Sequence, residues 1–228
     1  MSKLIVTTSW DDGAKSDLKL AELLNKYGIR GTFYIPKTYL DNPLAKDELR
    51  GLDKMHEVGA HTLNHSDLTK VSSSQAKEEI EGIKAYLEDI LGHKTDMFCY
   101  PYGKYNKNIK EMVRTAGFIA ARTCDHGSFD SIEDPYEWQI SLHASNGSSL
   151  MTLKIWLKSG ISIKSVIDWE IRAKLLFDAA LAQGGVYHIW GHSQEIYQKG
   201  EWEKFDRVLN YISNKEGVRY LTNGEIFT

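Results

Sequence analysis

Two patterns of apolar and polar residues alternate along the 228-residue chain. Short runs rich in apolar and β-branched residues have the composition of buried strands. They are residues 4–8, 29–35, 60–62, 97–100, 118–121, 139–143, 186–190 and 218–221. Between them lie stretches whose apolar residues recur at helical spacing, several of which end at glycine. These are residues 16–27, 47–58, 75–91, 106–115, 161–183 and 202–212.

Strands that alternate with helices predict a parallel sheet with right-handed crossovers. The chain shows no internal repeat, low-complexity tract or linker, so we expect one domain over residues 1–228. The polar residues of chemical interest follow several different strands. A closed or nearly closed barrel, which gathers its strand ends at one face, is therefore favoured over an open sheet.

Two adjacent carboxylates, Asp11 and Asp12, follow the first strand and precede Gly13. Glycine permits an abrupt exit from a strand, and α/β folds bind ligands at this edge. Neighbouring residues there point in different directions, so one carboxylate can hold a metal while the other stays free as a base. A plain turn is the alternative, because Asp-Asp-Gly is common turn chemistry.

Two imidazoles, His61 and His65, stand four residues apart near the end of the third predicted strand. This spacing lets both reach one cation, although the pair alone is weak evidence for a metal. Taken with an aspartate from another strand end, two histidines form a ligand set that leaves positions open for water and substrate.

Composition narrows the class of protein. The formal charge is −3, and without a basic tract we expect neither nucleic acid nor an anionic membrane as partner. No apolar run approaches the ~20 residues of a membrane span. No export signal is visible, and Cys99 and Cys124 form neither a disulfide framework nor a CxxC site. We therefore expect a cytoplasmic protein, whose oligomeric state the sequence leaves open.

Three motifs in order resemble the polysaccharide deacetylases, the NodB-like domain of carbohydrate esterase family 4. Residues 9–13, Ser-Trp-Asp-Asp-Gly, are similar to the family's T-F-D-D-G. Residues 61–65 match its H-S/T-x-x-H, and residues 98–103, Phe-Cys-Tyr-Pro-Tyr-Gly, align with F-R-x-P-Y-G. The resemblance implies a distorted (β/α) barrel of about seven parallel strands and metal-dependent removal of an acetyl group, usually from a sugar.

The resemblance also implies a role for each matching residue. Asp12, His61 and His65 would hold a divalent metal, most plausibly zinc, which lowers the pKa of its water and polarises the acetyl carbonyl. Asp11 would be the general base. The backbone N–H of Tyr102 would help to hold the oxyanion.

The family's last motif supplies a histidine that protonates the departing amine. His188 and His192 share one face of the strand that contains them, since strand side chains alternate. His192, at the carboxyl end, is the preferred acid. His188, about four residues deeper, is expected in the core or behind the site.

The chain departs from the family at position 99. The family arginine that orients the catalytic aspartate is Cys99 here, and we hypothesise that Arg122, at the end of the next strand, supplies the charge instead; an exposed loop arginine is the alternative. We also expect Trp10 and Tyr102 to line the site. The family's fourth motif finds no single match, and its candidates are Asp125, Asp130, Asp134 and Trp138.

The leading prediction is thus a metal-dependent deacetylase, a hydrolase of carbon–nitrogen bonds other than peptide bonds, that acts on N-acetylated, or O-acetylated, sugars or their oligomers and polymers. Two alternatives stay open. One is an amidohydrolase of the same fold that acts on a small non-sugar amide. The other is a non-catalytic carbohydrate-binding relative, a reading to which the missing arginine gives weight.

Overall fold

The computed structural model describes residues 4–127, 129, 132–145 and 168–228. Its centre is a sheet of parallel strands in the order β6-β5-β4-β3-β2-β1-β8-β7, with β9 paired to β1. The strands are β1 (Leu4–Asp11), β2 (Gly31–Ile35), β3 (Glu57–Ala60), β4 (Met97–Cys99), β5 (Ala120–His126), β6 (Trp138–Ile140), β7 (Leu142–His143), β8 (Gly185–Gly191) and β9 (Val218–Tyr220).

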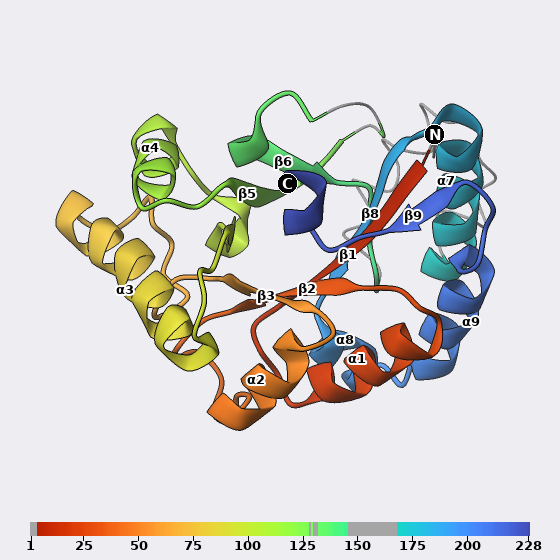
Figure 1. The fold of residues 1–228 in the computed structure, drawn as a ribbon, viewed down its shortest axis with the longest axis horizontal. Helices are drawn as coiled ribbons and strands as arrows, with labels where there is room; N and C mark the ends of the chain where they lie inside the picture. The colour runs from red at the N-terminus through yellow and green to blue at the C-terminus, as the bar shows by residue number, and fades with distance from the viewer. Residues whose placement is uncertain (1–3, 128, 130–131, 146–167) are drawn as a thin grey trace.

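The described helices surround this sheet, with α3 and α4 at one end and α7 and α9 at the other (Figure 1). They are α1 (Ser16–Lys26), α2 (Lys46–Asp53), α3 (Ser73–Leu91), α4 (Lys107–Thr115), α7 (Trp169–Gln183), α8 (Ser193–Gln198) and α9 (Trp202–Ile212). Three short 3-10 turns are η1 (Pro101–Gly103), η2 (Pro135–Glu137) and η3 (Gly224–Ile226). None of these described helices is both long and apolar enough to cross a membrane.

The segment that contains β6 and β7 almost closes the sheet into a barrel. β6 pairs with β5, and β7 pairs with β8, on the other side of the barrel. Only Ser141 separates the two short strands, and its N–H donates to the carbonyl of His188 at 2.9 Å. The predicted barrel is therefore confirmed. The described residues form nine strands rather than about seven; one predicted strand is broken into β6 and β7, and β9 lies beside the first half of β1.

Side chains of β1 alternate between the two sides of the sheet. Leu4, Val6 and Trp10 belong to the large core between the sheet and its helices. Thr7 and Ser9, on the other side, make buried hydrogen bonds to Asn223, which follows β9, and to His188 of the neighbouring β8. The strand thus brings a polar row along the barrel interior, and Asp11 continues that row at its carboxyl end.

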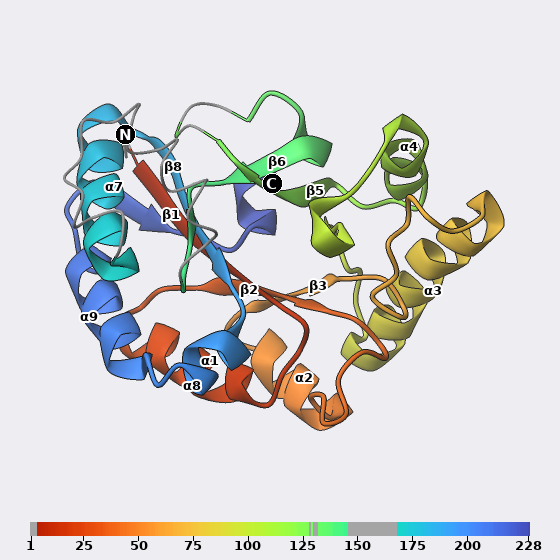
Figure 2. The same cartoon turned by 180° about the vertical axis from the view of Figure 1, so that it is seen from behind.

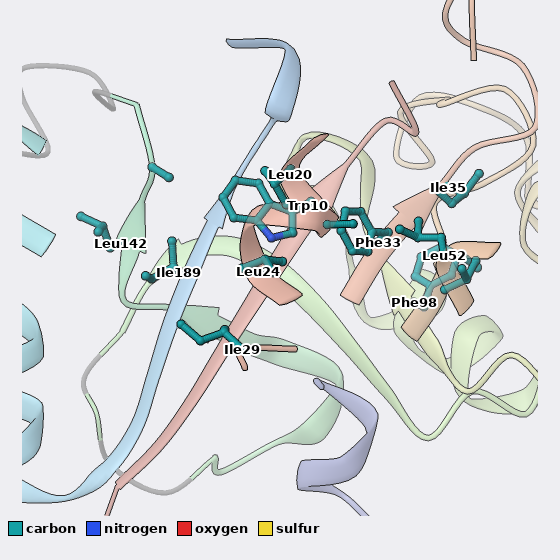
Figure 3. Close-up of a cluster of buried hydrophobic side chains, with 14 of the residues drawn as sticks. Trp10, Leu20, Leu24, Ile29, Phe33, Ile35, Leu52, Phe98, Leu142 and Ile189 are labelled. Atoms are coloured by element: carbon teal, nitrogen blue, oxygen red, sulfur yellow. The ribbon is translucent and has the colours of Figure 1, made fainter. Parts of the chain in front are cut away.

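Trp10 corrects one prediction from the sequence. Its ring is fully buried, and it packs edge-on against Phe205 of α9 with the ring centroids 5.2 Å apart. Figure 3 shows it beside Leu20 and Leu24 of α1, in the sheet–helix core. Since this side is opposite to that of Asp11, Trp10 does not line the site.

Two predicted element boundaries are also corrected, and one helix was missed. The helix predicted over residues 47–58 ends at Asp53, and its last part is β3. The strand predicted over residues 118–121 runs on to His126, so Arg122 lies inside β5 rather than in a loop. Helix α8 was not predicted, and of the helix predicted over residues 161–183 the part before residue 168 lies outside the described residues. The view from behind shows α8 directly after the carboxyl end of β8 (Figure 2).

Candidate active site

The carboxyl end of β1 points its two aspartates in different directions, as the sequence predicts. Asp12 and Gly13 have consecutive left-handed φ angles of 82° and 67°, which turn the chain sharply out of the strand. Asp11 remains in the barrel interior, where its residue is 3% exposed. Asp12 faces the histidines of the neighbouring loop. Backbone strain at a non-glycine residue marks a position that the surrounding structure holds in place.

Left-handed backbone recurs around this point. Of the six described non-glycine residues with positive φ, four lie in the three loops that carry the family motifs: Asp12, Thr62, His65 and Tyr102. Each such conformation costs about 1–3 kcal/mol and is commonest at functional sites. The strain is therefore concentrated where β1, β3 and β4 end.

Asp11 is paired with Arg122, as the sequence hypothesis proposed. Nη2 of Arg122 donates to both carboxylate oxygens of Asp11, and neither side chain is more than 3% exposed. Trp190 Nε1 also donates to Asp11, at 2.9 Å. Burial raises the pKa of Asp11, but the positive charge of Arg122 outweighs it and holds this pKa well below its ordinary value. Asp11 is consequently a carboxylate at any working pH.

Cys99 leaves room for this arrangement. Its position on β4 is in register with Arg122 on β5, and its Sγ lies 2.8 Å from Nη2 of Arg122. Burial raises the pKa of the Cys99 thiol well above its ordinary value, so the thiol is not a nucleophile at neutral pH. The small side chain allows the guanidinium to reach Asp11 from the next strand.

Asp12, His61 and His65 converge on one point. Asp12 Oδ1 lies 3.4 Å from Nε2 of His65 and 3.8 Å from Nε2 of His61, and the three ligand atoms lie within 4.8 Å of one another. His61 donates from Nδ1 to the carbonyl oxygen of Cys99 at 2.9 Å, which leaves the Nε2 lone pair facing Asp12. Burial lowers the pKa of His61 to about 3 and also lowers that of His65. Both rings are therefore neutral, as metal ligands must be.

Neighbouring side chains fix the loop that holds the two histidines. Glu79 of α3 accepts hydrogen bonds from the backbone and side-chain amides of Asn64 and from the hydroxyl of Ser66. Tyr39 stacks on the ring of His65, with the centroids 4.0 Å apart. These contacts orient the ring of His65 toward Asp12.

The donor atoms fit a divalent cation. Asp12 Oδ1 is buried and accepts no hydrogen bond from the described residues, and burial raises the pKa of Asp12 to about 6. A buried carboxylate oxygen without a donor is costly unless a cation compensates it. Two imidazole nitrogens and one carboxylate oxygen are ligands that zinc accepts.

His192 lies on the opposite side of Asp12, just before α8. Its Nε2 is 3.7 Å from Asp12 Oδ2, and its Nδ1 is 3.1 Å from Oε1 of Glu195. Burial disfavours the charged ring, but Glu195 and the two aspartates outweigh burial and raise the pKa of His192. His188, by contrast, is buried behind the site, bonded to Ser9 at 2.8 Å, and burial lowers its pKa to about 3.

Aromatic residues border the site in places that the sequence only partly predicted. The ring of Tyr102 is 56% exposed and meets the ring of His65 edge-on at 4.8 Å. Trp190, two residues before His192, is the tryptophan that contacts Asp11, whereas Trp10 lies in the sheet–helix core. Next to Tyr39 lies an open groove of about 670 Å³. Its lining includes Lys19, Tyr39, Asn42, Gln194, Tyr197 and Trp202.

The candidates for the fourth motif have other contacts. Asp134 caps η2 and pairs with Lys110, and Trp138 packs over His188 inside the barrel. The side chain of Asp125 is not seen in an ion pair among the described residues, and Asp130 lies outside them. The carboxylate beside His192 is Glu195, which the sequence analysis missed; its spacing three residues after His192, on a helix, was the available signal.

Comparison with known proteins agrees with this geometry. The family model described as polysaccharide deacetylase matches residues 1–121. The chain belongs to the polysaccharide deacetylase family. Curated relatives of this chain include the peptidoglycan-N-acetylglucosamine deacetylase PgdA of Listeria monocytogenes, 28% identical over 112 residues. That match covers 47% of this chain and 23% of PgdA.

A second relative is the peptidoglycan-N-acetylmuramic acid deacetylase PdaA of Bacillus subtilis, 25% identical over 103 residues, or 44% of this chain and 38% of PdaA. The matched part of the chain thus spans about a quarter to two fifths of these two proteins. Among solved structures, a polysaccharide deacetylase from Mycobacterium smegmatis superposes with a TM-score of 0.70 at 16% identity, covering 99% of this chain and 89% of that one. The chitin deacetylase of Colletotrichum lindemuthianum gives 0.63 at 19% identity, covering 99% and 87%. Both structures share the fold of this family member.

Proposed function

We propose that this protein is a metal-dependent deacetylase that removes an acetyl group from an N-acetylated or O-acetylated sugar within an oligosaccharide or polysaccharide. The observation that carries the proposal is the convergence of Asp12, His61 and His65 between the Asp11–Arg122 pair and His192. Candidate metal ligands, an ionised carboxylate and an imidazole of raised pKa lie together at one end of the barrel. Metal-assisted hydrolysis of an amide or ester uses a Lewis acid, a general base and a general acid.

Asp12 Oδ1, His61 Nε2 and His65 Nε2 are the ligands that we assign to the cation, and we propose zinc. When bound, zinc acts as a Lewis acid and makes water more acidic near neutral pH. Among the described residues this group consists of three side chains, a number that leaves coordination positions open for water and substrate. The Cys99 carbonyl and Glu79 keep the two imidazoles in place for this role.

Asp11 is the proposed general base. It is ionised and lies 4.0 Å from Nε2 of His61, so it borders the ligand cluster. Arg122 and Trp190 donate to its oxygens and fix the plane of the carboxylate. Its role is to take the proton of the attacking water. Arg122 and Trp190 lower the basicity of Asp11, but they also hold its carboxylate in a fixed orientation, which compensates for the lower basicity.

His192 is the proposed general acid. Its raised pKa keeps it protonated to a higher pH than a free histidine, and Nε2 is the nitrogen that faces Asp12. It would donate this proton to the departing nitrogen or oxygen of the sugar. The backbone N–H of Tyr102, in the turn after β4, is the proposed donor to the developing oxyanion.

The groove beside Tyr39 supports a carbohydrate substrate. Aromatic rings of Tyr39, Tyr197 and Trp202 offer flat faces on which sugar rings stack, and Asn42 and Gln194 offer hydrogen bonds to hydroxyl groups. A volume of about 670 Å³ exceeds the needs of one small acetylated amide. PgdA and PdaA are by name deacetylases of peptidoglycan sugars, which supports the same chemical class for this chain.

The test is metal content by mass spectrometry together with acetate release from a panel of N-acetylated and O-acetylated saccharides. We expect about one zinc per chain in the wild type and loss of both zinc and acetate release in Asp12→Ala. The matched control is Asp47→Ala, which removes a carboxylate that is 93% exposed on α2. Zinc without turnover on any saccharide would point to the small-amide or the carbohydrate-binding alternative, and no zinc after reconstitution would refute the ligand assignment.

A further inference from the structure

A second set of metal-ligating side chains adjoins the first. His143 ends β7, His192 follows β8, and Glu195 is in the first turn of α8. Glu195 Oε1 lies 3.1 Å from Nδ1 of His192 and 4.0 Å from Nε2 of His143. One ligand atom from each of the three lies within 4.8 Å of the other two. Because β7 and β8 are paired, this set is built on the sheet rather than on a free loop.

The second set repeats the chemistry of the first. Each consists of two imidazoles and one carboxylate, and the spacings of 3.1 and 4.0 Å resemble the 3.4 and 3.8 Å around Asp12. Burial lowers the pKa of His143 to about 4, so its ring is neutral at pH 7. Nδ1 of His192 and Nδ1 of His143 are buried and make no hydrogen bond of good geometry within the described part of the chain.

His192 connects the two sets. Its Nε2 faces Asp12 and its Nδ1 faces Glu195, so the ring lies between them. The other oxygen of Glu195 lies 3.2 Å from Nζ of Lys199, which leaves Oε1 for an additional ligand. The side chains of His192 and Glu195 are 24% and 35% exposed, so an ion has access from solvent.

We propose that His143, His192 and Glu195 form a second, weaker zinc site and that its occupation inhibits deacetylation. The inhibitory part rests on the proposed function, because it assumes that His192 is the general acid. Zinc would bind Nδ1 of His192 and Oε1 of Glu195, the two atoms that now face each other, on the side of the ring away from Asp12. The ion would tie the ring to Glu195 and His143, so that Nε2 could not move toward the departing group. The site is weaker than the first because the ammonium group of Lys199 lies beside it.

The binding test uses zinc alone, titrated into the full chain that already holds one equivalent. We expect a second zinc by calorimetry and by mass spectrometry after desalting at excess zinc. His143→Ala, which leaves Asp11, Asp12 and His192 in place, should weaken the second event. Loss even of an outer-shell partner costs a metal site about 10–100-fold in affinity, so loss of a ligand should cost at least about 100-fold. His93→Ala removes an imidazole that pairs with Asp53 on the surface, and it should leave both events unchanged.

The activity test measures acetate release against zinc concentration. The wild type should be active at one equivalent and inhibited at excess, whereas His143→Ala should keep its basal rate and require about 100-fold more zinc for the same inhibition. A single binding event, or a second event that persists in His143→Ala, would overturn the site. Two ions bound without inhibition would overturn the inhibitory role. Because binding is read without substrate, failure of the site is distinguishable from failure of the deacetylase proposal.

Discussion

Replacement of Arg122 by alanine removes the cation that contacts both carboxylate oxygens of Asp11. Both side chains are buried, so the variant leaves an unpaired carboxylate inside the barrel. Breaking such a pair from one side costs about 3–5 kcal/mol, a large part of the about 5–15 kcal/mol that keeps a domain folded. Alternatively the pKa of Asp11 rises and the group takes up a proton, which removes the proposed base.

We therefore expect Arg122→Ala to lose both stability and turnover. The free energy of unfolding, from urea denaturation at 25 °C, should fall by about 3–5 kcal/mol. The turnover number for acetate release should fall by about 10²–10⁴-fold, the usual contribution of a positioned acid or base. Arg122→Lys keeps the charge but cannot donate two bonds in the plane of a guanidinium, so it should recover stability more than turnover.

The register of β4 and β5 allows a stricter control. Cys99 and Arg122 are partners across the two strands, so the double variant Cys99→Arg/Arg122→Cys moves the guanidinium to the position where the family motif has arginine. It should regain part of the activity lost in Arg122→Ala. If Arg122→Ala instead keeps both the wild-type unfolding free energy and the wild-type turnover, Arg122 neither stabilises nor orients Asp11.

Three further variants test other parts of the site. Glu79→Ala removes three hydrogen bonds to the loop of His61 and His65, so it should lower zinc affinity by about 10–100-fold, measured with a competing chelator. Unchanged affinity would show that the loop keeps its conformation without Glu79. Burial raises the pKa of Asp17 from 3.8 to about 8, so the folded state binds the extra proton and the contribution of Asp17 to stability should be lost as the pH rises from about 4 to 8. The difference in unfolding free energy between the wild type and Asp17→Asn should therefore change with pH over this range in urea titrations, and a constant difference would contradict the assignment. Trp202→Ala should raise KM for oligosaccharides while leaving release of acetate from a single acetylated sugar unchanged, and an equal effect on both substrates would place the groove outside substrate binding.

The sequence by itself determined the parts of this protein that depend on local pattern. Alternating strand and helix signals gave the parallel barrel, since burial on both faces demands continuous apolar strands and crossovers demand helices. The motifs at Asp11–Asp12 and His61–His65 predicted which residues meet at one end of the barrel, because strand ends and four-residue spacing are local features. Arg122 was predicted as the partner of Asp11 because the family arginine at position 99 is replaced by Cys99, so that another residue must supply the positive charge.

Two features were decided by the tertiary structure alone. One is the face of each strand or helix that is buried, and the other is the distant residue that each side chain contacts. A single-residue alternation along β1 places Trp10 in the helix-covered core and Asp11 in the barrel, and the sequence does not say which side is which. The predicted strand at residues 118–121 ended too early because Arg122 interrupts its apolar run. The carboxylate of Asp11, across the barrel, compensates the charge of this buried arginine. His143 lies beside His192 because β7 pairs with β8, and Glu195 lies there because the short helix α8 follows His192. Helix α8 is too short to show a periodic apolar pattern in the sequence.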